Sequence, residues 1–240
     1  MRPAIVHGPD IRPERTASGA AVRTVLDTAG TGGRLVRRLV DVPPGASHAG
    51  TTGPAGELWF LISGTGRLDV DGRTGEVGRY QGIWLPPGVS YRLQAAEPKT
   101  VGLDVVELPA AAGSDDADSA RPVVVSNLAD CAVEMTGDRR FRVLFGPDRG
   151  CARATQFLGE IPPGRAPAHQ HAYDEVVLVL AGEGIVHTGD ADHRLAPGTC
   201  VHLPPGQQHC LENTGPATLT VLGVFHPGGS PAAKTVVAAG

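Results

Sequence analysis

The chain contains one pattern twice, and this duplication restricts it to two similar domains. A shift of 118 residues places Glu57 on Glu175 and, without a gap, the Leu-Pro-Pro-Gly of residues 85–88 on the Leu-Pro-Pro-Gly of residues 203–206. A period of this length indicates a duplicated domain, because solenoid repeats recur every ~20–50 residues.

The repeat sets the expected domain boundaries. We expect a first domain at residues 1–109, a linker at residues 110–121 and a second domain at residues 122–240. The linker is rich in small, polar and acidic residues, a composition that predicts a mobile segment.

Both copies are typical of β structure. The 33 glycines and 21 prolines separate short apolar runs, which is the pattern of strands joined by tight turns. Helix signals are weak throughout, and the 41% apolar content is enough for a core. We therefore expect an all-β fold of the antiparallel jelly-roll type in each copy.

Charge and composition argue against several classes of partner. The net charge of −4 is spread evenly along the chain, and only 4% of residues are aromatic, so neither nucleic acid nor a membrane surface is an expected partner. No secretory leader or membrane-spanning apolar run is visible, and the four cysteines have no CxxC spacing. We expect a reduced, cytoplasmic protein, and the abundance of Arg, Ala and Gly suggests a bacterial source.

Four residues of the second copy form a predicted metal site. His169 and His171 are two residues apart, so in a strand they point to the same face, and Glu175 follows closely. His209 comes after a Pro-Pro-Gly turn. Three imidazoles and a carboxylate suit Fe, Mn, Co, Ni, Cu or Zn. They leave coordination positions open on a metal that prefers six ligands, and an open position indicates chemistry.

These residues carry a resemblance to a known family. The second copy resembles the cupin superfamily in both of its motifs, with one departure: four residues, where five are expected, separate Gly164 from His169. The matching positions are Gly164, His169, His171, Glu175 and Gly182 in the first motif, and Gly198, Pro204, Gly206, His209 and Asn213 in the second. The resemblance implies a bicupin, with two tandem cupin (double-stranded β-helix, or jelly-roll) barrels. It also implies one divalent transition metal per chain, iron first, with Mn, Ni, Co, Cu or Zn as alternatives.

The first copy departs from the motif. Thr51 and Gly53 stand where the paired histidines are expected, Tyr91 stands in place of the last histidine, and only Glu57 is retained. We expect this barrel to be metal-free, a structural partner or a small-molecule pocket, although His48 nearby leaves a rearranged site open. A buried Glu57 would need a hydrogen-bond donor, for which Tyr91 is the candidate.

Three residues are candidates for catalysis. Glu175 could leave the metal and act as a base. Arg165 could clamp a substrate carboxylate, the alternative being a solvated loop residue. His202 could act as a base near the metal, the alternative being a structural residue at a position where the first copy has Trp84.

The expected function is a metal-dependent enzyme that acts on a small organic molecule. The resemblance to cupins favours an oxygenase, similar to quercetin or diketone dioxygenases, or an isomerase of bacterial secondary metabolism. The alternatives are a Lewis-acid hydrolase or decarboxylase of the ureidoglycine aminohydrolase or oxalate decarboxylase type, and a non-catalytic small-molecule-binding cupin. We expect a homodimer, although two barrels in one chain also permit a monomer.

Overall fold

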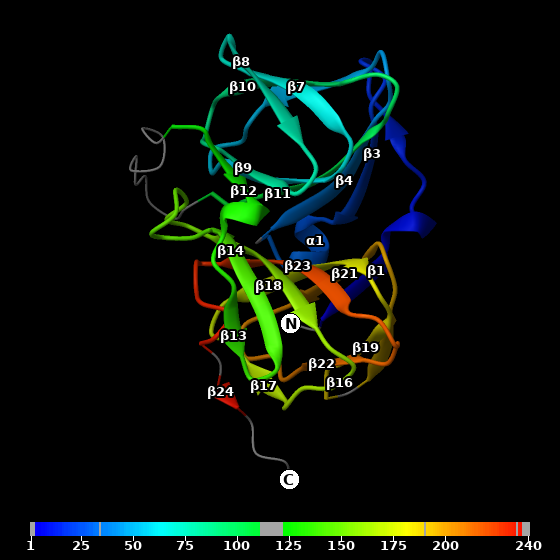
Figure 1. The fold of residues 1–240 in the computed structure, drawn as a ribbon, viewed down its shortest axis with the longest axis vertical. Helices are drawn as coiled ribbons and strands as arrows, with labels where there is room; N and C mark the ends of the chain where they lie inside the picture. The colour runs from blue at the N-terminus through cyan, green and yellow to red at the C-terminus, as the bar shows by residue number, and fades with distance from the viewer. Residues whose placement is uncertain (1–2, 34, 111–121, 190, 234, 237–240) are drawn as a thin grey trace. The chain divides into compact units, whose positions relative to one another are not determined.

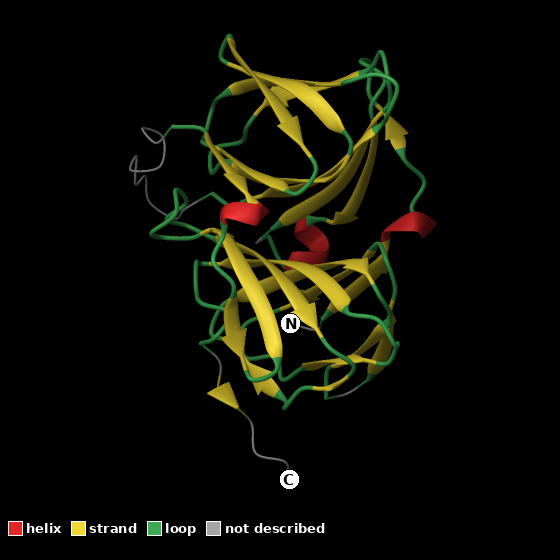
Figure 2. Cartoon of the chain, viewed as in Figure 1, coloured by secondary structure: helices red, strands yellow, loops and turns green. Residues whose placement is uncertain are grey.

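The computed structural model describes residues 3–33, 35–110, 122–189, 191–233 and 235–236. Within these residues the chain is almost entirely strand and turn (Figure 2), which confirms the all-β expectation. Helical structure there is limited to α1 (Thr28–Thr31) and two 3-10 turns. Nearly all of the expected linker, residues 111–121, lies outside the described part of the chain. None of the helices in the described part is long and apolar enough to cross a bilayer.

The chain forms two compact units, here called the first barrel (residues 10–130) and the second barrel (residues 1–9 and 131–240). These units differ from the expected domains in the placement of two short strands. β1 pairs with β21 of the second barrel, and β12 pairs with β9 of the first barrel. The barrel to which β1 and β12 belong is therefore decided by strand pairing, which the sequence repeat does not reveal.

Each barrel is built from short strands, which Figure 1 labels and colours in chain order. The first barrel contains α1 and η2 (Leu128–Asp130) with β2 (Glu14–Arg15), β3 (Ala21–Leu26), β4 (Val36–Val42), β5 (Ser47–Thr51), β6 (Glu57–Ser63), β7 (Thr65–Val70), β8 (Arg73–Gly78), β9 (Gln81–Leu85), β10 (Ser90–Ala95), β11 (Val101–Glu107) and β12 (Val124–Asn127). The second barrel contains β1 (Ala4–His7), β13 (Glu134–Thr136), β14 (Arg139–Phe145), β15 (Thr155–Ile161), β16 (Gly164–Arg165), β17 (His169–Gln170), β18 (Asp174–Ala181), β19 (Gly184–His187), β20 (Asp192–Leu195), β21 (Thr199–Leu203), β22 (Cys210–Asn213), β23 (Leu219–His226) and β24 (Thr235–Val236). The turn η1 (Gly8–Asp10) follows β1.

The two barrels have the same strand order. The large sheet runs β12-β9-β6-β11-β4-β3-β2 in the first barrel and β1-β21-β18-β23-β15-β14-β13 in the second. The small sheets, β5-β10-β7-β8 and β16-β22-β19-β20, correspond in the same way. In the second barrel, β17 and β24 form an additional two-stranded sheet. The duplication seen in the sequence is therefore a duplication of topology.

The central strand of the second barrel, β18, places the site. It pairs with β21 on one side and β23 on the other, and its first six residues are buried, as its continuous apolar run predicts. Because side chains alternate along a strand, Val177 and Val179 pack in the core with Val201 and Leu203. Glu175 belongs to this inward-facing row, at the end of the strand nearest the histidines.

One buried side chain closes the turn after β22. The Asn213 amide donates to the carbonyls of Ile161 and Ala217, at 2.8 and 2.7 Å, and its Oδ1 accepts from the backbone N–H of Gly215 at 3.0 Å. It thereby satisfies three backbone groups at a chain reversal that strand pairing leaves open. Asn213 is thus a structural brace.

Replacement of Asn213 should be costly to the fold. We expect Asn213→Ala to lower the free energy of unfolding by about 2–4 kcal/mol, because buried backbone groups lose their partners. Urea denaturation measures this loss. Asn127→Ala, at an exposed position, is the matched control and should cost less than about 1 kcal/mol. Equal losses in the two variants would contradict the bracing role.

Candidate metal centre

Backbone pairing brings the two motif segments together. The N–H of His169 donates to the carbonyl of His209 at 2.9 Å, and the N–H of His209 donates to the carbonyl of His169 at 2.9 Å. In the Pro-Pro-Gly turn before His209, the N–H of Gly206 donates to the carbonyl of His171 at 2.8 Å. These bonds place two stretches of chain that are 40 residues apart (209 − 169) beside one another.

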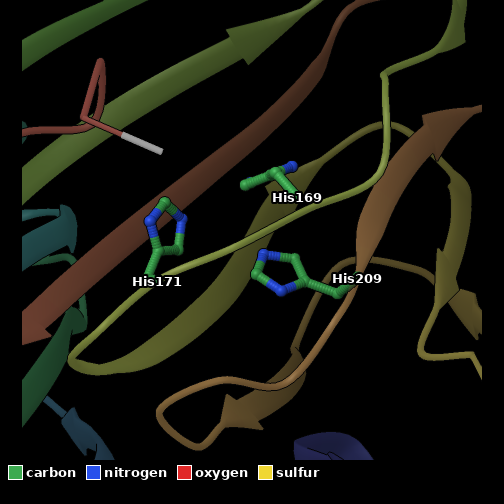
Figure 3. Close-up of side chains that lie close together, drawn as sticks. All are labelled: His169, His171 and His209. Carbon is green, nitrogen blue, oxygen red and sulfur yellow. The ribbon is translucent and has the colours of Figure 1, made fainter. Parts of the chain in front are cut away.

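The three predicted histidines converge. His169 and His171 come from one segment and His209 from another, and their rings gather at one place (Figure 3). One ligating nitrogen from each lies within 4.8 Å of the others, and all three residues are buried. This spacing is suitable for a single metal ion with nitrogen ligands.

Each imidazole is oriented by a backbone carbonyl. The Nδ1–H of His169 donates to Pro167 at 3.1 Å, and that of His209 donates to Gln207 at 2.9 Å. The Nδ1–H of His171 donates to Ala233 at 3.3 Å. A carbonyl oxygen only accepts, so Nδ1 carries the proton and Nε2 keeps the lone pair for a metal.

Glu175 supplies a carboxylate to the same point. Its Oε2 lies 3.3 Å from Nε2 of His209 and 3.5 Å from Nε2 of His171. The oxygen is buried, yet no group of the described chain makes a hydrogen bond to it in good geometry. A buried carboxylate oxygen without a donor is expensive unless a cation binds it, so the residues present fit a metal ion.

The electrostatics favour the protonation states that a metal requires. Burial lowers the pKa of His169 to about 4, and the neighbouring His209 adds to this effect. Burial alone would raise the pKa of Glu175, but the imidazoles of His209, His171 and His169 outweigh it and lower the pKa. Conversely, Glu175 outweighs burial and raises the pKa of His209. A neutral His169 and an ionised Glu175 are ready to coordinate at neutral pH.

The four residues line a small cavity of about 70 Å³. One wall is apolar, formed by Phe141, Phe157 and Phe225, and Phe157 fits because a Cβ at position 223 would overlap its ring. The volume lies far below the ~300–1,000 Å³ of pockets that take drug-sized ligands.

A larger hollow of about 780 Å³ borders β7 and β8 of the first barrel, but no metal-ligating cluster of the described residues lies there.

The structure does not bring the other two candidate residues to this cavity. Arg165 is exposed, and its Nε donates to Sγ of Cys210 at 3.4 Å. His202 lies on the face of β21 that points away from the core, fully buried, with Nε2 2.8 Å from Oδ1 of Asp174. The strand register explains why His202 points away from the core. His202 is paired with Val176, and Val176 faces the opposite side of the sheet from its neighbour Glu175.

In the first barrel, an indole occupies the corresponding interior. Nε1 of Trp59 donates to Oε2 of Glu57 at 2.7 Å, so the donor is Trp59 and not Tyr91. Tyr91 packs edge-on against Trp59, with ring centroids 4.7 Å apart, and its hydroxyl lies 3.5 Å from Nε2 of His48. Val177 stands at the equivalent position of the second barrel, where its smaller side chain leaves the interior open.

Sequence reasoning missed two contributors to the site. Arg139 lines the cavity from β14, 30 residues before the first histidine. The C-terminal part of the chain also contributes: Ala233 accepts from His171, and β24 pairs with β17. The Tyr173 hydroxyl also donates to Ala233, at 3.1 Å. Neither contributor belongs to a motif, and only the strand register places them.

Removal of residues 230–240 should weaken metal binding. We expect the metal affinity to fall by roughly 10–100-fold, the loss usual when a ligating histidine loses its hydrogen-bond partner. Here His171 loses the carbonyl of Ala233, which orients its ring. Competition with a chromophoric chelator measures the affinity. A variant that lacks only residues 237–240 is the control, and unchanged affinity in the longer deletion would show that this carbonyl is dispensable.

Glu57 should make stability depend on pH. Burial raises its pKa to about 7, the hydrogen bond from Trp59 opposes the rise, and the charge of Glu107 adds to it. Because the folded-state pKa is raised, the associated stability is present below pH 4.5 and is lost as the pH rises to about 7.

The substitution Glu57→Gln removes the loss of stability at high pH, because Gln does not ionise, and its amide oxygen still accepts the hydrogen bond from Trp59. We expect it to be more stable than the native chain at pH 8 by about 2–3 kcal/mol, and to differ little at pH 4. Chemical denaturation at the two pH values measures the difference, with the exposed Glu76→Gln as control. A difference independent of pH would contradict the raised pKa.

Comparisons with known proteins find relatives of part of the second barrel. Residues 157–225 match the family model described as Cupin domain. The chain is 32% identical over 68 residues to an oxalate-binding protein of Thermotoga maritima, and 31% identical over 64 residues to auxin-binding protein T85 of Nicotiana tabacum. The matches cover 28% and 22% of this chain, and span 56% and 34% of those relatives.

Solved structures share the fold over nearly all of the chain. A mutant of oxalate decarboxylase from Bacillus subtilis superposes with a TM-score of 0.77 at 14% identity, covering 97% of this chain and 79% of that one. Protein Ylba from E. coli gives 0.77 at 12% identity, with 94% and 90% covered. At such identities the likeness shows the fold alone. The matches thus show a cupin domain at residues 157–225, and a fold like that of these solved structures over both barrels.

Proposed function

We propose that the second barrel holds one divalent transition metal and that the chain is an enzyme acting on a small organic molecule. The observation that carries this proposal is the buried Oε2 of Glu175, which lacks a hydrogen-bond donor in the described chain and lies 3.3–3.5 Å from two imidazole nitrogens. His169, His171, Glu175 and His209 are the proposed ligands. The first barrel, where Trp59 fills the interior, is proposed to be metal-free.

When bound, the metal would supply Lewis acidity or, if redox-active, a centre for oxygen chemistry. Iron is proposed first, with Mn, Ni, Co, Cu or Zn as alternatives, because the ligand set suits all of them. A structural neighbour is described as having Mn(II) centres, a property of that oxalate decarboxylase.

The chain's own residues define the conditions of the reaction. The imidazoles hold their protons on Nδ1, away from the cavity, and Glu175 brings one negative charge to the ligand set. The phenylalanine wall keeps water from one side of the substrate. Among the cavity residues, Glu175 is the buried carboxylate that can accept a proton if it leaves the metal. We propose an oxygenase or isomerase reaction, with a Lewis-acid hydrolase or decarboxylase as the alternative.

A non-catalytic binding protein is a second candidate. The similarity to an oxalate-binding protein and an auxin-binding protein favours it, since both are described by what they bind. In that case the metal would orient a bound ligand without converting it. The homodimer, the cytoplasmic location and the bacterial source stay predictions.

Metal analysis of the untagged protein tests the proposal. We expect about one transition metal per chain by plasma mass spectrometry, lost in His209→Ala and kept in His193→Ala, a histidine outside the cavity. Two metals per chain would show that the first barrel also binds one. No uptake after anaerobic reconstitution would reject the metal site.

Oxygen consumption then separates the reactions. Substrate-dependent oxygen uptake by the metal-loaded protein, measured with an electrode, supports the oxygenase. Conversion without uptake supports the isomerase or Lewis-acid alternatives, and binding without conversion supports the binding protein.

A further inference from the structure

Two neighbouring arginines, Arg139 and Arg140, line the metal-site cavity, and they differ in their surroundings. Arg139 is the first residue of β14 and lies on the same strand face as Phe141, so both residues line the cavity with the proposed ligands. The side chain is half-buried. Burial lowers the pKa of its guanidinium, while the charges of Asp138 and Glu175 oppose the shift.

The guanidinium is held in position but is not neutralised. Its Nη2 donates to the carbonyl of Leu211 at 2.7 Å, which ties it to the strand that follows His209. In the described part of the chain, Arg139 makes no ion pair with a carboxylate. The adjacent Arg140, in contrast, lies 3.6 Å from Glu160 and is largely exposed. Most of the five N–H donors of Arg139 therefore have no acceptor among the described residues.

A partly desolvated cation without a counter-ion favours the binding of an anion. Glu175 is the carboxylate whose charge acts on Arg139 from within the cavity, but its oxygen is directed at the histidines. The planar guanidinium suits the two oxygens of a carboxylate. The cavity of about 70 Å³ restricts the rest of such a molecule to a few atoms, and the phenylalanine wall favours an apolar middle.

We propose that Arg139 anchors the carboxylate of a short organic acid whose other end faces His169, His171, Glu175 and His209. This inference rests on the proposed function and names its substrate class. It also moves the anchoring role from Arg165, the candidate of the sequence analysis, to Arg139. Arg139 selects among substrates by charge, and the apolar wall selects by length.

Binding measurements on cobalt-loaded protein test the proposal. The charged probes are oxalate and malonate, and malonamide is the neutral probe. We expect Arg139→Gln to weaken the binding of both anions about tenfold or more by calorimetry, because a charge-assisted bidentate contact is lost. Binding of malonamide should be unchanged. Arg142→Gln, on the same strand but outside the cavity, is the matched control and should bind like the native chain.

The outcomes separate this inference from the metal site itself. Cobalt content is measured before and after each titration, and it should equal that of the native chain in Arg139→Gln. Native protein that takes up no cobalt would reject the proposed function. Cobalt-loaded native protein that binds neither anion, or Arg139→Gln that binds both as tightly as the native chain, would overturn the role of Arg139.

Discussion

The candidate site depends on the pair of backbone hydrogen bonds between His169 and His209, each 2.9 Å long. They align two segments that have little regular structure of their own, so that imidazoles from both reach one point. The carbonyls of Pro167, Gln207 and Ala233 then set the ring orientations. The metal ligands are thus positioned by backbone groups, which no side-chain substitution removes directly, and this gives the site a rigid base.

The barrels show how one topology supports two interiors. Glu57 and Glu175 occupy equivalent places at the start of equivalent strands, but two residues later the side chain is Trp59 in one case and Val177 in the other. The indole N–H satisfies the first carboxylate and its ring fills the interior. The second carboxylate is left facing three imidazoles. Side-chain volume at one core position and the three ligand positions both contribute to the difference.

The sequence predicted the fold and the ligand cluster because both depend on local patterns. Period-two spacing places His169 and His171 on one face, and short apolar runs between Gly and Pro predict strands. Arg139, Ala233 and the placement of β1 and β12 depend on which strands pair, and this register has no local signal. His202 illustrates the limit: a shift of one residue in register decides whether a side chain faces the cavity or points away from it.

The placement of β1 has a consequence for the order of folding. Ala4 pairs with His202, so β1 finds its neighbour only after almost the whole second barrel has been synthesised. Contacts between such distant segments form slowly, because the ends of a long loop must first meet. Until then β21 presents an unpaired edge beside the apolar β18. A fragment of residues 131–240 would keep that edge permanently, so the metal site cannot be separated from the N-terminus without exposing a surface prone to association.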